Sequence, residues 1–373
     1  MKQALKDILR KPFQVLGYDI RRIKTGRNHD SDLGENQVVP NVWRRTAYLD
    51  LVPLRLKTTG LAVALLGSVV ETSLLRQALE VRGFKVTEFE WDWDSEVPVV
   101  PSEAAVVLCR LPMNEGQWRT VRELKKKFGA RLIGLQELIL PLTTIRQSQA
   151  SLTYNLDTLE RVVSYYTGEK YFGPLDQLNA LFPLAGKTVI EFGPMEGAQT
   201  AGLVALGAKH VTCVEARAES YIKTMVAQYA LGWENVNLVM DDFHNADELK
   251  YGVFDLAFAH GVYYHSVAPF FFFENLMSLS KNIFIGGYTY DPRNASPDSL
   301  ETLAYEGRNY RVKRVSMGRS YNAGVNEYGY HFTSEDLAAF FEERGYDVKI
   351  ISDDEAGDVW GDRYLRFLAG KNP

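Results

Sequence analysis

The chain has 373 residues, of which 46% are hydrophobic and 24% are charged, and its formal net charge is −5. These proportions match folded soluble proteins and exclude wholesale disorder or a fibrous repeat, and the length predicts two domains with a small appendage. The negative charge argues against a protein built mainly to follow nucleic acid. The sequence has neither a run of roughly 18 apolar residues nor a cleavable leader, so we expect a cytoplasmic protein.

The first 57 residues are predicted to form a basic helix and a linker. Residues 1–27 hold eight Lys or Arg residues against two acids, and the apolar residues at positions 4, 5, 8 and 9 share one helical face before Pro12. Such a helix can rest on an anionic membrane surface. The simpler interpretation is a solvated or lightly docked terminal helix, because short amphipathic starts are common.

Strands and helices alternate over residues 58–148, which predicts a small parallel α/β domain. The expected strands are 61–67, 85–91, 104–111 and 131–139, and the expected helices are 73–83 and 117–129. Because only Gly67 and Ser68 follow the first strand, we expect this domain to shape a substrate cleft or a dimer contact rather than to bind a nucleotide. Cys109 and Cys213 lie in apolar runs and are expected to be buried, reduced thiols.

Residues 149–373 are predicted to form a second α/β domain. After a helical segment at 151–182, strands are expected at 188–193, 210–216, 235–240, 254–261 and 282–290. Residues 347–354 and 363–371 are expected to pair as a closing hairpin. The fold class is therefore α/β, with a Rossmann-like, doubly wound sheet and a smaller N-terminal α/β domain.

Three features of this second domain carry further expectations. The helix at 218–232 is expected to be amphipathic, and the helix at 269–280 to cover the sheet with core residues. Residues 291–329 are expected to form an irregular insert, followed by a helix capped at Ser334 and Gly345. The expected apolar face of the first helix consists of Tyr221, Ile222, Met225, Val226 and Tyr229.

A glycine turn follows the first strand of the second domain. It reads Gly193-Pro194-Met195-Glu196-Gly197, whereas a dinucleotide site requires G-x-G-x-x-G so that the pyrophosphate can approach the amides of the next helix. Met195 occupies the place of the second glycine, and Glu196 would repel a pyrophosphate. The turn therefore disfavours a hydride-transferring dehydrogenase.

The next two strands end in acids. Glu215 lies twenty-two residues beyond Gly193, where a carboxylate can accept both ribose hydroxyls of an adenosine. The third strand ends in Asp241-Asp242-Phe243, an acid and a ring suited to the amine and the face of adenine. Three strand ends thus present groups that match a zwitterionic adenosine ligand.

With these motifs the sequence resembles the class I S-adenosylmethionine-dependent methyltransferases over about residues 185–290 and again at the C-terminal strands. The resemblance implies S-adenosyl-L-methionine as the cofactor, with the methionine moiety near the glycine turn, ribose on Glu215 and adenine on Asp242 and Phe243. Residues 259–265 are similar to a motif of the branch that includes the tRNA wobble-uridine carboxymethyltransferases, and GPMEGAQT is similar to bacterial glycan- or small-molecule-tailoring methyltransferases. The implied cofactor residues are Glu191, Gly193, Pro194, Gly197, Glu215, Asp242, Phe243, His260 and Gly261.

Methyl transfer requires alignment of the acceptor, and a hydroxyl acceptor benefits from a base. His265 has an ordinary pKa suited to that role, and His260 is the competing candidate, although its position favours the cofactor pocket. Of the neighbouring tyrosines, one should line the acceptor site and the other fill the core, and we assign Tyr264 to the acceptor side. No metal is expected.

The insert is the expected source of acceptor specificity. Its Arg forks suit phosphate or carboxylate, and its Tyr faces suit sugars or bases, although a solvated basic loop has the same composition. The residues assigned to the acceptor are Arg308, Arg311, Arg314 and Tyr310.

The sequence therefore predicts a methyltransferase that acts on an oxygen of a glycan, a nucleotide-sugar or another small molecule. A tRNA-modifying relative and a non-catalytic binding protein with the same fold are the alternatives.

Overall fold

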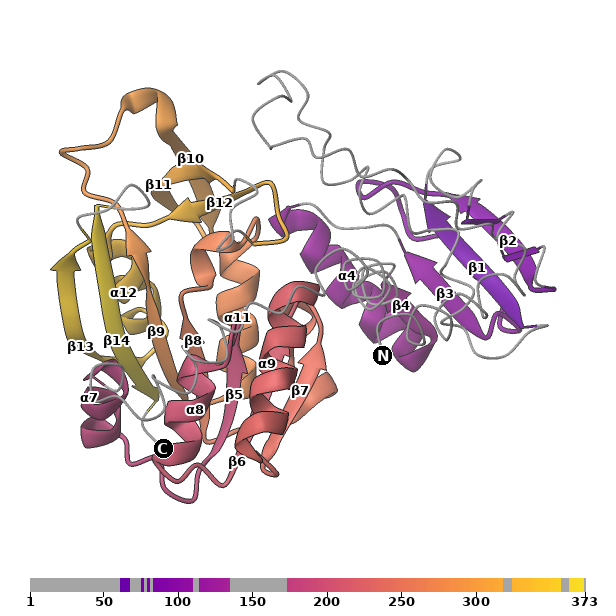
Figure 1. The fold of residues 1–373 in the computed structure, drawn as a ribbon. Helices are drawn as coiled ribbons and strands as arrows, with labels where there is room; N and C mark the ends of the chain where they lie inside the picture. Colours follow the sequence, from indigo (N-terminus) through magenta and orange to yellow (C-terminus); the bar gives the residue numbers. More distant parts are fainter. Residues whose placement is uncertain are drawn as a thin grey trace, which may run out of the picture. The chain divides into compact units, whose positions relative to one another are not determined.

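The computed structural model describes residues 61–67, 75–76, 79–80, 83–109, 114–134, 173–317, 324–356 and 362–371 (Figure 1). Residues 41–373 form one compact unit. The basic segment 1–27, much of the expected helix 73–83 and residues 151–172 lie outside the described residues. Within the described part of the chain, no helix combines the length and the apolar character needed to cross a membrane.

The smaller sheet has four parallel strands in the order β2-β1-β3-β4, as the alternating pattern predicts. Helix α4 begins after Asn114, whose side chain accepts a hydrogen bond from the amide of Gln117. It buries Trp118, Val121, Leu124 and Phe128, which share one helical face. The elements are β1 Ala62–Gly67, β2 Lys85–Glu90, β3 Val106–Cys109, α4 Glu115–Phe128, η2 Gly129–Arg131 and β4 Leu132–Gly134.

The larger sheet has seven strands in the order β13-β14-β9-β8-β5-β6-β7. Strands β5 to β9 are parallel, and β14 runs antiparallel to both of its neighbours. The strands are β5 Thr188–Phe192, β6 His210–Glu215, β7 Val236–Met240, β8 Leu256–His260, β9 Asn282–Thr289, β13 Tyr346–Glu355 and β14 Arg363–Lys371. The predicted closing hairpin is confirmed as β13 and β14.

Helices and short turns connect these strands (Figure 1). The α-helices are α7 Gly173–Leu181, α8 Ala198–Ala205, α9 Ala218–Leu231, α10 Glu248–Tyr251, α11 Pro269–Leu279 and α12 Ser334–Glu342. The 3-10 turns are η3 Phe243–Asn245, η4 Tyr263–His265 and η5 Pro297–Ser299.

The chain direction across the larger sheet reverses between β5 and β8. From β5 the chain moves outward to β6 and β7, and it then returns to place β8 and β9 on the other side of β5. In doubly wound sheets, ligands bind beyond the carboxyl ends of the strands at this switch point. The predicted Rossmann-like, doubly wound sheet is therefore confirmed, and the glycine turn after β5 lies at its switch point.

Helix α11 joins two hydrophobic clusters. Phe270, Phe272 and Phe273 are fully buried against the larger sheet and α12, as expected for residues 269–280. Phe271 packs instead with Trp118 and other buried residues of α4, which lies beside α11. The aromatic run thus forms core on both sides of the helix.

The expected apolar face of α9 is wrong. Tyr229 and Met225 are 90% and 45% exposed, and the helix buries Ala218, Thr224 and Ala227 instead. Small side chains permit the backbone of α9 to approach the sheet closely, because they add little volume between the two. The orientation of this helix therefore follows from close packing of small side chains against the sheet, and not from the total hydrophobicity of one helical face.

The insert is a small antiparallel sheet, which corrects the expectation of irregular structure. Its strands are β10 Leu300–Tyr305, β11 Arg308–Ser316 and β12 Tyr328–His331, in the order β10-β11-β12. The expected cap of α12 is also one residue off, because Thr333, and not Ser334, accepts the amide of Asp336 at 3.0 Å.

Candidate cofactor and acceptor site

The glycine turn after β5 has a left-handed backbone at alternate positions. Gly193, Met195 and Gly197 have φ angles of 63°, 57° and 86°. A Cβ on Gly193 would lie 2.4 Å from Cγ1 of Val262, so only glycine fits there. Met195 adopts the conformation that the missing glycine would supply, at the cost of about 1 kcal/mol for a side chain in this region. The backbone of the turn therefore has the left-handed conformation that a glycine would adopt at position 195, although the residue there is methionine.

Glu215, at the end of β6, is bonded to this turn. Its Oε2 accepts the amide of Met195 at 3.2 Å, and its Oε1 accepts the amide of Arg217 at 2.8 Å. Burial raises the pKa of Glu215 to about 7. The predicted ribose acid and the predicted methionine loop are thus brought together at the switch point.

Glu191 lies inside the domain, where α8 meets the sheet. Its Oε2 accepts hydrogen bonds from the hydroxyl of Thr200 at 2.6 Å and from the thiol of Cys213 at 3.3 Å. Burial raises its pKa to about 7 as well, and it also keeps the Cys213 thiol protonated. In the structure, Glu191 is therefore hydrogen-bonded to buried side chains inside the domain.

Glu196 does not act as the isolated charge that the sequence indicates. It is mostly buried, and its Oε1 lies 3.3 Å from Nζ of Lys223 on α9. The paired lysine offsets the repulsion that we expected between this residue and a pyrophosphate. The carbonyl of Pro194 accepts the amide of Gly197 at 2.7 Å and closes the turn.

The end of β7 carries the expected adenine pair and a histidine that the sequence analysis missed. Oδ1 of Asp242 lies 2.7 Å from Nδ1 of His244, and Nε2 of His244 lies 2.7 Å from the hydroxyl of Ser266. All three side chains are buried. Phe243 is only partly buried and its ring centroid lies 4.4 Å from that of Phe272. No sequence motif marks His244, because its partners come from distant segments.

His260 ends β8 between α8 and β14. Its Nδ1 lies 3.3 Å from Nε2 of Gln199, and its Nε2 lies 3.5 Å from the hydroxyl of Tyr364. A Cβ on Gly286 would lie 2.3 Å from Cδ2 of His260, so that glycine makes room for the ring, and its carbonyl accepts the amide of Gly261. Burial lowers the pKa of His260 to about 3.

His265 and Tyr264 lie on η4 under the insert. Nδ1 of His265 lies 2.9 Å from the sulfur of Met317, and Asn326 donates a hydrogen bond to its carbonyl. Burial lowers the pKa of His265 to about 4, which corrects the ordinary value that we assumed from the sequence. Tyr264 is partly buried, whereas Tyr263 is fully buried in the core.

The insert uses most of its assigned residues for its own structure. Arg308 forms ion pairs with Asp336 and Glu343. Arg314 pairs with Glu301 at 3.1 Å. Tyr310 is buried among the aromatic residues of the core, so its ring does not offer the face that we assigned to an acceptor. Arg311 is exposed. Among the described residues, no group of three His, Cys, Asp or Glu side chains is arranged to hold a metal ion.

The order of the larger sheet and its antiparallel strand β14 define the fold as that of the class I S-adenosylmethionine-dependent methyltransferases, as the sequence resemblance implies. No family model matches the sequence, and no curated protein matches it.

Several solved structures are similar to this chain. The N-terminal domain of EvdMO1 with SAH bound is 22% identical, with a TM-score of 0.46 over 53% of this chain and 81% of that one. A DhpI-SAM-HEP complex is 17% identical, with a TM-score of 0.36 over 61% and 97%. Magnesium protoporphyrin IX methyltransferase from Synechocystis PCC 6803 with SAM bound is 13% identical, with a TM-score of 0.38 over 57% and 84%.

Proposed function

We propose that the chain is an S-adenosylmethionine-dependent methyltransferase that acts on an oxygen of a glycan, a nucleotide-sugar or another small molecule. The observation that carries the proposal is the hydrogen bond from the amide of Met195 to Glu215 at the switch point. This bond joins a loop that suits the methionine end of the cofactor to a carboxylate that suits its ribose. The bond supports the proposal because it brings these two groups together where doubly wound sheets bind ligands.

The residues around the switch point fit this cofactor. The turn from Gly193 to Gly197 would hold the methionine moiety, Glu215 the ribose hydroxyls, and Asp242 with Phe243 the adenine. Because Gly193 has no side chain, it packs closely against Val262 and no Cβ projects from the end of the strand, which suits a ligand lying across it. The bound cofactor supplies an activated methyl group, and the protein has to align the acceptor with it.

We propose His265 as the base for the acceptor hydroxyl and Tyr264 as a neighbour of the acceptor, with His260 as the competing base. Burial lowers the pKa of both histidines, so both rings are neutral at pH 7, but each accepts a proton less readily than an ordinary imidazole does. Replacing His265 or His260 by Asn shows which of the two is the base, since loss of the base lowers kcat without weakening cofactor binding.

The cofactor proposal is tested by titration calorimetry of the full chain with S-adenosylhomocysteine and, in parallel, with NAD. We expect binding of the first and not of the second. Glu215→Gln removes one charged acceptor of the ribose hydroxyls and should weaken binding about 10- to 100-fold, or about 1.5–3 kcal/mol. Asp347→Asn changes an exposed carboxylate on β13 and serves as the matched control. Unaltered affinity in Glu215→Gln would contradict the ribose assignment.

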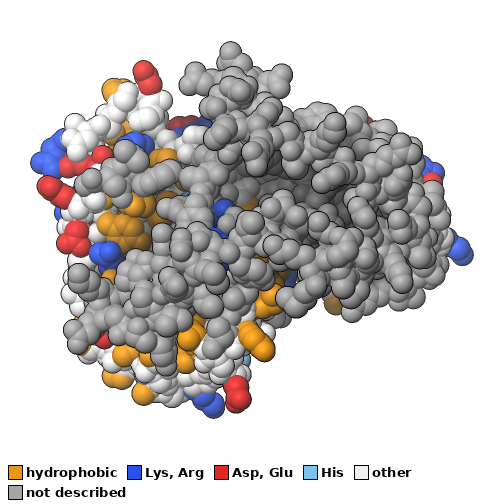
Figure 2. Space-filling model, in the orientation of Figure 1, with side chains coloured by type: hydrophobic (Ala, Val, Ile, Leu, Met, Phe, Trp, Pro, Cys, Tyr) orange, Lys and Arg blue, Asp and Glu red, His pale blue; other side chains and the backbone are white. Residues whose placement is uncertain are grey.

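The acceptor is identified with radiolabelled S-adenosylmethionine and three acceptor pools, namely oligosaccharides, nucleotide-sugars and total tRNA. Label in tRNA alone would favour the tRNA-modifying alternative. Its salt dependence would then test whether arginines bind phosphates. In the part of the surface that Figure 2 shows in colour, Lys and Arg side chains lie among Asp and Glu side chains. Binding of S-adenosylhomocysteine without label in any pool would favour the non-catalytic alternative.

We also propose that the protein works in the cytoplasm. Cys109 and Cys213 are buried free thiols, as expected from the sequence, and such thiols suit a reducing compartment. Cell fractionation with an antibody against the full chain tests this location, and recovery with the membrane pellet at high salt would contradict it.

A further inference from the structure

Helix α4 of the small domain contacts the histidine beside the proposed adenine site. The indole of Trp118 stacks on the imidazole of His244, with ring centroids 4.7 Å apart and planes inclined by 19°. Both side chains are only 2% exposed. A flat ring stacked in a closed space restricts the neighbouring ring to one orientation.

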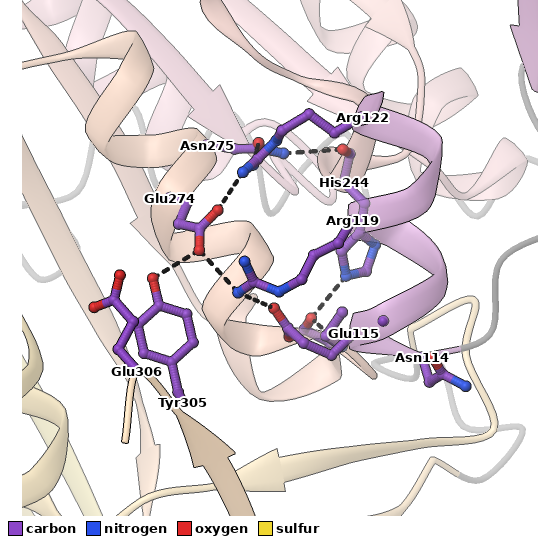
Figure 3. Close-up of polar contacts among 12 residues, drawn as sticks. Asn114, Glu115, Arg119, Arg122, His244, Glu274, Asn275, Tyr305 and Glu306 are labelled. Carbon is purple, nitrogen blue, oxygen red and sulfur yellow. Dashed lines mark hydrogen bonds and ion pairs between the residues drawn. The ribbon is translucent and has the colours of Figure 1, made fainter. Parts of the chain in front are cut away.

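The same helix reaches His244 by a second route (Figure 3). Nη2 of Arg122 donates to Oδ1 of Asn275 at 2.8 Å, and Nδ2 of Asn275 donates to the carbonyl of His244 at 2.9 Å. Arg122 and Arg119 also form ion pairs with Glu274 on α11, which hold α4 against that helix. Trp118 thus restrains the ring of His244, and Arg122 restrains its backbone.

His244 in turn fixes the carboxylate of Asp242. A carboxylate only accepts hydrogen bonds, so Nδ1 of His244 donates to Oδ1 of Asp242 at 2.7 Å. The other ring nitrogen shares a hydrogen bond with Ser266, so both nitrogens have partners. Because one oxygen of Asp242 is fixed, the plane of the carboxylate is fixed, and so is the direction of its second oxygen.

We propose that Trp118 is a positioning residue for adenine recognition, and that the small domain thereby sets the specificity of the cofactor site. The proposal rests on the proposed function, because it takes Asp242 as the acceptor of the adenine amine. A correctly oriented carboxylate accepts the 6-amino group of adenine and repels the 6-oxo group of hypoxanthine. Trp118 acts on this choice through His244 and touches no ligand itself.

A packing role alone for Trp118 leads to a different expectation. Loss of packing lowers the stability of the whole domain and weakens every ligand that binds only the native state to a similar extent. Loss of positioning weakens the adenine ligand while the hypoxanthine ligand is little changed. The ratio of the two affinities therefore separates the two roles.

The experiment is titration calorimetry of the full chain with S-adenosylhomocysteine and with its hypoxanthine counterpart, S-inosylhomocysteine. We expect wild type to prefer the adenine ligand at least about 10-fold, since a mispaired buried polar group costs on the order of 1–3 kcal/mol. Trp118→Leu keeps an apolar side chain and removes the flat ring, and it should abolish most of this preference. Trp118→Phe keeps a ring and should restore it. Phe128→Leu, at the other end of α4, is the matched control and should retain the wild-type preference.

Two further outcomes keep the inference separate from the proposed function. If wild type fails to bind S-adenosylhomocysteine, the proposed function is wrong. If wild type binds it and Trp118→Leu retains the full preference, or loses both affinities equally, only the positioning role is wrong. Should Trp118→Leu fail to fold, Arg122→Gln breaks the second connection to His244, which runs through Asn275. Arg122 is partly exposed, and the proposal again requires a reduced preference for the adenine ligand in this variant.

Discussion

The buried carboxyl of Glu191 should make the stability of this protein fall as the pH rises toward neutrality. Glu191 is 1% exposed and its partners are the neutral hydroxyl of Thr200 and thiol of Cys213. Burial raises its pKa from 4.5 to about 7. The native state therefore holds a proton that the unfolded chain releases between these two values, so the free energy of unfolding decreases over that interval.

The size of this effect follows from the two pKa values. A difference of about 2.5, at about 1.4 kcal/mol for each tenfold change in proton affinity, corresponds to about 3 kcal/mol above pH 7. Glu191→Gln removes the titration and keeps the shape of the side chain. The stability of the variant relative to wild type should therefore rise by about 2.5 kcal/mol from pH 5 to pH 8. A buried amide that lacks a partner adds a constant penalty of about 1–3 kcal/mol, which does not depend on pH.

The assay is urea unfolding of both proteins at pH 5, 6, 7 and 8, followed by tryptophan fluorescence. The difference between the two free energies is plotted against pH, so that the titration of other groups cancels. Glu234→Gln makes the same chemical change at an exposed position and is the control. Parallel curves for wild type and Glu191→Gln would refute the inference that burial of this carboxyl governs the pH dependence.

Three further predictions concern the site. Gly286→Ala introduces a Cβ 2.3 Å from Cδ2 of His260 and displaces that ring, so, with His260 at the cofactor pocket, the affinity for S-adenosylhomocysteine measured by calorimetry should fall about 10-fold, and unchanged affinity would contradict that placement of His260. Met195→Gly should leave the melting temperature unchanged or raise it, whereas Met195→Val should lower stability by about 1–2 kcal/mol, because a β-branched side chain is poorly tolerated at a φ of 57°. If His265 is the base, kcat at saturating substrates should stay constant from pH 8 down to about pH 5, because its pKa is about 4, and a fall centred near pH 6.5 would contradict the role of burial.

The sheets were predictable from the sequence because their strands are short apolar runs that end at glycines or acids. The runs at 188–193 and 254–261 correspond to β5 and β8, and their alternation with helices indicated a parallel sheet. The acids at the strand ends were predictable for the same reason, since parallel strands bring their carboxyl ends to one edge. Glu215 is the clearest case, because the sequence predicted it at the end of a strand, and in the structure it ends β6 and accepts the amide of Met195 in the glycine turn.

The contacts between distant segments were not predictable. His244 is stacked on Trp118, which lies 126 residues earlier, and is hydrogen-bonded to Ser266 on another loop. The lowered pKa of His265 depends on burial beneath the insert, and a sequence gives no measure of that burial. The strand β11 did carry a usable signal, since buried Tyr310 and Val312 alternate with exposed Arg311.

The ion pairs of the insert change what acceptor specificity is expected to depend on. Arg308 is paired with Asp336 on α12 and with Glu343 at the end of that helix, so its charge holds the insert to α12 rather than meeting a phosphate. The insert also lies directly on η4, because a Cβ on Gly329 would meet the carbonyl oxygen of Tyr264 at 1.8 Å, and one on Gly324 would meet Cβ of His265 at 2.7 Å. Such close backbone contact fixes the space above the proposed base. We therefore expect the shape of the space beside Tyr264 to select the acceptor. Of the three arginines assigned to the acceptor, exposed Arg311 is the one for which the described residues show no ion pair.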